Sequence, residues 1–313
     1  MDFETAYAGI DRLRGNIEKV IVGKPGVINL GIICLLAEGH LLIEDVPGVG
    51  KSMLAKAMAK SIRATAKRIQ FTPDLLPSDI TGAMIYNQKD QSFAFKKGPI
   101  FANIILADEI NRATPRTQSS LLEAMEEQQV TVDGETHALQ RPFFVIGTQN
   151  PIEFEGTYPL PISQLDRFMI KAKFGYLGKD DEVRMLRDRK ESPPLDGIGA
   201  VMGVEDVCGM QDIVRSVKVE DSIYDYVVNI VSATRSSDQL ALGASPRTTL
   251  RLFRATQAMA LVQKRAYVIP DDVKAVAGPV LAHRVIVKAP VQYRGQPSET
   301  VLTDILNQVA VPY

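Results

Sequence analysis

The residues with the clearest chemistry lie in a glycine-rich segment early in the chain. An apolar run at 41–43 leads into Asp45-Val46-Pro47-Gly48-Val49-Gly50-Lys51-Ser52, and a helical pattern follows, which is the context of a P-loop. Glycines let backbone N–H groups curve around a phosphate, and the N-terminus of the next helix adds partial positive charge. Lys51 is expected to reach the β- and γ-phosphates, and the Ser52 hydroxyl is expected to ligate Mg²⁺. The residues expected to bind ATP are Val46, Gly48, Val49, Gly50, Lys51, Ser52 and Met53.

One position departs from the general P-loop pattern, which begins with glycine. Asp45 occupies that position. The alternative interpretation is a turn that contains Gly-Val-Gly-Lys-Ser by coincidence. The P-loop is favoured because a strand precedes the segment and a helix follows it.

Two acidic residues follow another apolar run. Residues 104–107 are Ile-Ile-Leu-Ala and lead into Asp108 and Glu109, at the sheet edge where nucleotides bind in such folds. Asp108 is expected to hold Mg²⁺, directly or through water, and Glu109 to orient and polarise the attacking water as the general base. The alternative is an acidic helix N-terminus, which the position of this pair after a P-loop disfavours.

Two further polar residues extend the candidate set. Residues 144–150 are predicted to be a buried strand that ends in polar amides. Its last residue, Asn150, is suited to hydrogen-bond the γ-phosphate or the lytic water, although a turn before the next proline is the alternative. Ser245 and Pro246 begin a helix whose first turn contains Arg247, where the helix dipole disfavours a cation. A bound phosphate removes that conflict, so we expect Arg247 to contact phosphate rather than to be a solvated arginine.

The elements that must position these residues are those of a parallel sheet with covering helices. Five short apolar runs of β-type composition alternate with helical patterns. They are residues 41–43, 69–71, 104–107, 143–146 and 168–172. Two further segments, 83–97 and 130–136, are predicted to be hairpin insertions, and the second contains Asp-Gly between β-branched runs.

The second half of the chain is predicted to be a smaller all-α lid domain. Residues 191–203 contain Ser-Pro-Pro, three glycines and little periodicity, which indicates a linker. Helical patterns follow at 207–217, 223–233, 246–264, 271–277 and 299–309. The sequence therefore predicts a nucleotide-binding α/β domain at 1–190, a linker at 191–203 and the lid at 204–313.

The composition argues against several other classes of protein. Lys and Arg total 36 and Asp and Glu total 37, so no global field draws the chain onto nucleic acid or an anionic membrane. Cys34 and Cys208 lie in apolar helix-like stretches, so neither a disulfide framework nor a zinc site is expected. The first residues lack signal-peptide features, and no apolar run has the length of a membrane span. We expect a cytoplasmic protein without direct membrane insertion and without a nucleic-acid partner.

Together these motifs resemble the MoxR family of AAA+ ATPases over the whole chain. The resemblance is carried by Glu-Asp-Val-Pro-Gly-Val-Gly-Lys-Ser at 44–52, Ala-Asp-Glu-Ile-Asn-Arg-Ala at 107–113, Leu-Leu-Glu-Ala-Met-Glu-Glu at 121–127, Thr-Gln-Asn-Pro at 148–151, and Thr-Tyr-Pro-Leu-Pro through Leu-Asp-Arg-Phe at 157–168. MoxR-type P-loops carry aspartate at the position of Asp45. The two hairpins resemble insertions of the AAA+ branch that includes Mg chelatase and minichromosome-maintenance helicases. Ile162 departs from the family pattern, which usually has an acid there.

The resemblance implies roles that the residues alone do not fix. Asn150 is similar to sensor 1 and Arg247 to sensor 2. Arg167, at the start of the fifth strand and next to sensor 1, is similar to the arginine finger that acts on a neighbouring subunit's ATP; the alternative is a surface arginine paired with aspartate. The resemblance also implies a homo-oligomer, usually a hexameric ring, that remodels or matures client proteins in the manner of a chaperone. Such ATPases often act with a protein that bears a von Willebrand factor A domain.

Two other classes of function fit parts of the sequence. A helicase-like motor is disfavoured because the tip of the second hairpin carries Asp133, Gly134 and Glu135 instead of basic residues, although Lys96 and Lys97 lie by the first hairpin. A chelatase-type subunit or a nucleotide switch without turnover is the second alternative. The candidate catalytic residues favour hydrolysis, because nucleotide binding requires little beyond the P-loop and Mg²⁺.

Overall fold

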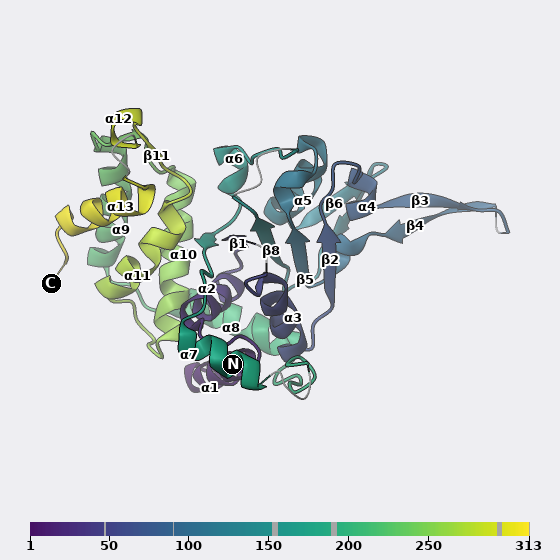
Figure 1. Ribbon diagram of the computed structural model, residues 1–313, viewed down its shortest axis with the longest axis horizontal. Coiled ribbons are helices and arrows are strands. Elements are labelled where there is room, and N and C mark those ends of the chain that lie inside the picture. The colour runs from purple at the N-terminus through teal and green to yellow at the C-terminus, as the bar shows by residue number, and fades with distance from the viewer. Residues whose placement is uncertain (47, 90, 152–155, 189–192, 293–295, 313) are drawn as a thin grey trace.

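The central sheet of the computed structural model has five parallel strands in the order β2-β5-β8-β1-β9 (Figure 1). The structure describes residues 1–46, 48–89, 91–151, 156–188, 193–292 and 296–312. The strands are β1 Leu41–Glu44, β2 Ala66–Gln70, β5 Ile104–Asp108, β8 Phe144–Gln149 and β9 Ile170–Ala172. The predicted parallel sheet is confirmed. Because all five strands run in one direction, their carboxyl ends share one edge of the sheet and their amino ends share the opposite edge.

Side chains of β1, β5 and β8 alternate between two separate apolar cores. Ile104 and Leu106 face the larger core, to which the first three long helices and the helical half of the chain contribute. Ile105 and Ala107 face the smaller core, to which α5 contributes. The first five helices of the chain are α1 Phe3–Glu18, α2 Pro25–Leu36, α3 Lys51–Ser61, α4 Pro77–Thr81 and α5 Pro115–Glu127. The sheet is thus covered on both faces, as its continuous apolar strands require.

Both predicted hairpins are present. One pairs β3 Gly82–Asn87 with β4 Ser92–Lys97 and projects from the body of the molecule, and the other pairs β6 Gln129–Val132 with β7 Glu135–Ala138 (Figure 1). The turn of the second has φ of 50° at Asp133 and 85° at Gly134, the backbone that Asp-Gly favours. Phe95 stacks on His137 with ring centroids 4.4 Å apart, so the two hairpins contact each other.

The helical half contains all five predicted lid helices. They are α8 Val204–Ser216, α9 Asp221–Ser236, α10 Pro246–Val262, α11 Pro270–Leu281 and α13 Ser298–Gln308. A short antiparallel pair, β10 Leu240–Leu242 and β11 Ile286–Val287, lies among them and was not predicted, because two or three residues give no periodic signal. The other short elements are η1 Pro99–Phe101, η2 Ile110–Arg112, α6 Ile162–Leu165 and α12 Ala289–Gln292.

The junction between the two halves is only partly described. Residues 191 and 192 of the predicted linker lie outside the described residues, and 193–203 contain neither helix nor strand. The preceding helix α7 Lys179–Asp188 was missed by the sequence analysis. The larger core is continuous across the two halves, so we keep the division at 191–203 as a proposal. None of the described helices is long and apolar enough to cross a membrane.

Candidate active site

The predicted P-loop connects β1 to α3, and Asp45 anchors it. Gly48 and Gly50 have φ of 87° and 107°, in the left-handed region that favours glycine. The Asp45 carboxylate accepts hydrogen bonds from the backbone N–H of Val46 at 2.8 Å and of Gly175 at 2.6 Å. Asp45 therefore ties the loop to the segment after β9. This contact gives a structural reason for aspartate where the general pattern has glycine.

The Lys51 ammonium group lies back over the loop. Its Nζ donates to the carbonyl oxygen of Asp45 at 2.7 Å and to that of Gln149 at 3.5 Å, and the residue is buried. The position of a Cβ on Gly48 has no described atom within 4 Å. A phosphate can therefore approach the loop backbone without steric obstruction, next to a fixed positive charge.

Asp108, at the end of β5, lies opposite Ser52. Ser52 Oγ is 3.5 Å from Asp108 Oδ2, and Thr148 donates its hydroxyl to Asp108 Oδ1 at 2.6 Å. Arg68 of β2 forms an ion pair with Asp108 Oδ2 at 2.7 Å. Hydroxyl and carboxylate oxygens are the ligands that Mg²⁺ prefers, and Arg68 already holds a positive charge at this carboxylate. The residues present therefore fit a divalent cation at this point.

Glu109 has a strained backbone and a carboxylate that two neighbours hold. Its φ is 56°, an uncommon value for a residue with a Cβ, and its N–H donates to Thr148 Oγ1 at 2.9 Å. Its Oε2 accepts from the Gln70 amide at 2.9 Å and from Arg112 at 3.0 Å. These contacts fix the carboxylate beside the P-loop.

These side chains line one cavity of about 280 Å³ at the carboxyl edge of the sheet. Its lining is Gly48, Gly50, Lys51, Ser52, Met53, Asp108, Glu109 and Asn150. Asn150 is 5% exposed and reaches this cavity from the end of β8. Of the residues predicted to bind nucleotide, Val46 lies outside this lining and Val49 lines a second, adjoining cavity.

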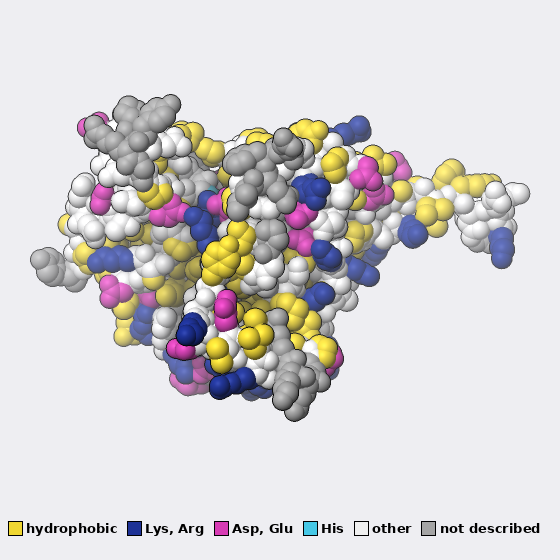
Figure 2. Space-filling model, in the orientation of Figure 1, with side chains coloured by type: hydrophobic (Ala, Val, Ile, Leu, Met, Phe, Trp, Pro, Cys, Tyr) yellow, Lys and Arg dark blue, Asp and Glu magenta, His cyan; other side chains and the backbone are white. Residues whose placement is uncertain are grey.

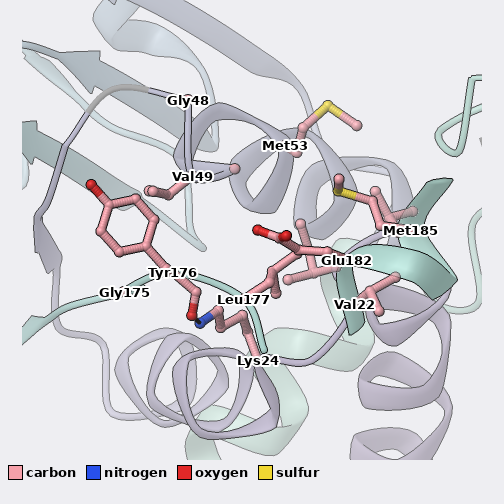
Figure 3. A pocket seen from close by; sticks show the side chains of 13 residues that line it. Val22, Lys24, Gly48, Val49, Met53, Gly175, Tyr176, Leu177, Glu182 and Met185 are labelled. Atoms are coloured by element: carbon pink, nitrogen blue, oxygen red, sulfur yellow. Dashed lines mark hydrogen bonds between the residues drawn. The ribbon is translucent and has the colours of Figure 1, made fainter. Parts of the chain in front are cut away.

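The second cavity, also of about 280 Å³, shares Gly48, Gly50 and Met53 with the first and extends away from the phosphate-binding loop (Figure 3). Its walls come from the α1–α2 connection, the P-loop, the segment after β9 and α7. Apolar side chains predominate, and the Glu182 carboxylate points between them (Figure 3). Lys24 Nζ donates to the Tyr176 carbonyl oxygen at 2.8 Å and holds two of the walls together.

Arg167 and Arg247 meet at the opposite edge of the sheet. Arg167 Nε lies 3.1 Å from Glu126 Oε2, and Arg247 NH1 lies 2.8 Å from Glu126 Oε1. Arg167 precedes the amino end of β9, whereas Asn150 follows the carboxyl end of β8, and β1 separates these two strands. The expectation that Arg167 lies next to sensor 1 is therefore wrong, because strand order in the sheet differs from strand order in the chain.

The lid holds the segment that precedes β9. Arg284, after α11, is 3% exposed and donates to Asp166 Oδ1 at 2.6 Å and to the carbonyl oxygens of Asp166 and Met169 at 2.9 and 3.0 Å. Burial lowers the pKa of Arg284 to about 10. His283 contacts the Phe168 carbonyl oxygen at 3.0 Å, and burial lowers its pKa well below the usual range. Arg167 thus lies in a backbone segment that the lid fixes on both sides.

Several residues at these sites were missed by the sequence analysis. Gln70 is the last residue of β2 and lies at the same sheet edge as Asp108. The predicted strand ended one residue later, at Phe71, so Gln70 was not recognised as a polar residue at a strand end. Thr148 links the two acids but lies within an apolar strand. Glu126 is one of several acids at the end of α5, and no sequence signal separates it from the others.

Comparison with known proteins gives consistent matches along the chain. Residues 40–170 match the model of the ATPase family associated with various cellular activities (AAA), and residues 232–305 match the AAA lid domain. The Bacillus subtilis protein named "Uncharacterized protein YeaC" is 50% identical, over 95% of this chain and 93% of its own. Chaperone MoxR1 of Mycobacterium tuberculosis is 39% identical, over 97% of this chain and 82% of its own.

A solved structure has the same fold throughout. The crystal structure of a candidate ATPase from Cytophaga hutchinsonii superimposes with a TM-score of 0.92 at 38% identity, over 99% of this chain and 97% of that chain. Protein MoxR of Methylorubrum extorquens is a more distant relative, at 28% identity over 92% of this chain and 89% of its own.

Proposed function

Because this chain belongs to the MoxR family of AAA+ ATPases, we propose that it hydrolyses ATP to drive chaperone-like remodelling or maturation of client proteins. The observation that carries this proposal is the first cavity. Lys51 and Ser52, Asp108 and Glu109, and Asn150 come from three separate segments and line the same space. Such a convergence supplies phosphate contact, a cation site and a water-activating group together.

The two adjoining cavities support ATP as the substrate. The triphosphate lies along the P-loop in the first cavity, with Lys51 at the β- and γ-phosphates. The base occupies the second, mostly apolar cavity, between Val49 and the segment around Tyr176. Ser52 and Asp108 would hold Mg²⁺, which neutralises phosphate charge when bound. Glu109 accepts a proton from the attacking water, and Asn150 orients that water or the γ-phosphate.

The separation of the two sheet edges supports action between subunits. The five strands of the central sheet hold three to six residues, so the edges lie on the order of 10–20 Å apart at about 3.3 Å per residue. Arg167 and Arg247 therefore cannot contact the phosphates bound by Lys51 of the same chain without a large rearrangement. In a head-to-tail ring, each subunit supplies these arginines to its neighbour's ATP.

The remaining parts of the proposal come from the relatives. One relative is named as a chaperone, which supports a protein client. We propose a hexameric ring in the cytoplasm, with a von Willebrand factor A domain protein as its partner. These assignments rest on the family and not on a contact in this chain.

A nucleic-acid motor is the main competing function. Basic and acidic side chains are interspersed over the face that Figure 2 shows, and the chain has a formal net charge of −1. Phosphate neutralisation by clustered basic residues supplies most non-specific affinity for DNA. We expect neither single-stranded DNA nor RNA to raise the steady-state rate of ATP hydrolysis.

An ATPase assay on the purified chain tests the proposed function. Wild-type protein is expected to release phosphate from ATP, Lys51→Ala to lose nucleotide binding, and Glu109→Gln to keep binding without turnover. A clear rise of turnover with single-stranded DNA would favour the motor. Tight ATP binding without hydrolysis by the assembled wild type would favour a nucleotide switch.

A further inference from the structure

A single carboxylate joins the two arginines at the amino edge of the sheet. Glu126 lies in the last turn of α5, Arg167 precedes β9, and Arg247 lies in the first turn of α10. Each oxygen of Glu126 faces a different guanidinium group, at 2.8 Å for Arg247 and at 3.1 Å for Arg167, whose Nε makes an ion pair without hydrogen-bond geometry. Three elements that are far apart in the sequence therefore converge on one carboxyl group.

The surrounding charges are predominantly positive. Arg251, one helical turn after Arg247, interacts with Asp166, Glu126 and Arg247, and its buried Nε has no hydrogen-bond partner among the described residues. Three arginines, Arg167, Arg247 and Arg284, pair with the two carboxylates of Glu126 and Asp166, and Arg251 lies near both. A cluster with this excess of cations is suited to receive an anion, and a triphosphate on a neighbouring subunit has that charge.

The geometry leaves both arginines able to bind that anion. A guanidinium group has five N–H donors in a fixed planar arrangement, and Glu126 takes a contact from one nitrogen of each. Without the carboxylate, two like charges would lie close together and would repel each other, and both side chains would gain rotamer freedom. The contact with Glu126 therefore occupies one nitrogen of each guanidinium group and orients the remaining N–H donors.

We propose that Glu126 is a positioning residue that aligns Arg167 and Arg247 as a pair for the ATP of the adjacent subunit. This inference rests on the proposed function, in which the two arginines act between subunits. A purely structural role is a poorer account of the contacts. Glu126 and both arginines are partly exposed at a helix end, where ion pairs contribute little to folding.

The first test is steady-state kinetics of Glu126→Gln in the full chain. A misdirected catalytic group lowers the rate of the chemical step more than it lowers ground-state binding, so we expect kcat to fall roughly 10- to 100-fold with an unchanged KM for ATP. Glu126→Asp keeps the charge with a shorter reach and should give an intermediate kcat. Glu127→Gln is the matched control, because Glu127 is exposed on the same helix end, and it should retain wild-type kcat.

The second test assigns the defect to a subunit. In a Glu126→Gln subunit the P-loop is intact, and in a Lys51→Ala subunit the arginine pair is intact, so mixing the two should recover activity that neither has alone. Adding Glu126→Gln to the Arg167→Ala, Arg247→Ala double variant should lower kcat no further. An altered KM, a wild-type kcat for Glu126→Gln, or no recovery on mixing would each overturn the proposal.

A reference mixture separates this inference from the function on which it rests. If Arg167→Ala and Lys51→Ala complement each other but Glu126→Gln and Lys51→Ala do not, only the role of Glu126 is wrong. If neither mixture recovers activity while the subunits assemble together, action between subunits is wrong and the role of Glu126 fails with it.

Discussion

The carboxyl and amino edges of the sheet hold two kinds of polar site. At the carboxyl edge, the polar residues end a strand, directly follow one or lie where the P-loop meets α3, and together they line open cavities. At the amino edge, α5, β9, α10 and the end of α11 bring charged residues together in ion pairs. The carboxyl edge thus combines open cavities with ion pairs of Asp108 and Glu109, whereas at the amino edge one carboxylate, Glu126, joins two arginines.

This difference shows what a single chain lacks. Of the groups that neutralise charge on a transferring phosphoryl group, the described lining of the cavity at the carboxyl edge has a lysine but no arginine. Arg68 and Arg112 beside it are already paired with Asp108 and Glu109. The amino edge has Arg167 and Arg247, whereas the P-loop lies at the carboxyl edge of the same chain. The two edges are complementary, and a neighbour can bring them together.

Removal of the arginine at the amino edge should have the largest effect. We expect Arg167→Ala to lower turnover by roughly 10³- to 10⁵-fold and to bind ATP as wild type does, because the finger acts on charge that develops in the transition state. Phosphate release and equilibrium nucleotide binding measure the two quantities. Arg116→Ala, at an exposed position of α5, is the control and should be as active as wild type. A matching loss of ATP affinity in Arg167→Ala would place Arg167 in its own subunit's site.

Glu109→Gln should produce the next largest loss, at the carboxyl edge. The amide keeps the hydrogen-bonding shape but cannot accept a proton, so turnover should fall roughly 10²- to 10⁴-fold. Because Lys51 and Ser52 remain, nucleotide binding should persist. Isothermal titration with ATP in the presence of Mg²⁺ measures the binding, and a variant that turns over at the wild-type rate would exclude Glu109 as the base.

Arg284→Ala tests how strongly the lid is joined to the amino edge. The substitution removes a buried cation and leaves the Asp166 carboxylate and several carbonyl oxygens without their donor. Breaking a buried ion pair in this way costs about 3–5 kcal/mol, so the free energy of unfolding should fall by that amount. Urea denaturation measures it, with Arg116→Ala as a surface control. A change below about 0.5 kcal/mol, typical of surface positions, would show that the lid is held elsewhere.

The Arg68 ion pair at the carboxyl edge should give the smallest effect. Arg68 is about half exposed and pairs with the same Asp108 oxygen that faces Ser52, so it competes with Mg²⁺ for that carboxylate. An exposed pair is worth less than about 1 kcal/mol, which corresponds to less than about fivefold in binding. Arg68→Ala should therefore lower the Mg²⁺ concentration for half-maximal ATPase activity by up to that factor. A higher Mg²⁺ requirement would mean that Arg68 assists the bound nucleotide instead.

The carboxyl edge could be predicted from sequence because its residues follow strand ends. Asp108 and Asn150 lie at the ends of predicted strands, and Lys51 lies in the glycine-rich segment that follows another. Parallel strands bring such positions together. Gln70 also ends a strand at this edge, and it was missed only because the strand was predicted to be one residue too long.

The amino edge could not be predicted in the same way. Glu126 pairs with residues 41 and 121 positions further along the chain, in two other elements, and no local pattern encodes that meeting. The position of Arg167 relative to Asn150 depended on strand order, which places β1 between β8 and β9. Long-range packing determines both the ion pairs of Glu126 and the position of Arg167, and the spacing of motifs in the sequence does not predict either.

The central claim is that the two edges form one catalytic site only across a subunit interface. The most direct test mixes Lys51→Ala with Arg167→Ala at a fixed total concentration and varies their ratio. In an equal mixture that assembles at random, about a quarter of the interfaces join a subunit with an intact Lys51 to a neighbour with an intact Arg167. ATPase activity should therefore be near zero for each variant alone and should peak near the equal ratio. Activity that stays at the level of the separate variants at every ratio, while the subunits demonstrably assemble together, would contradict the account.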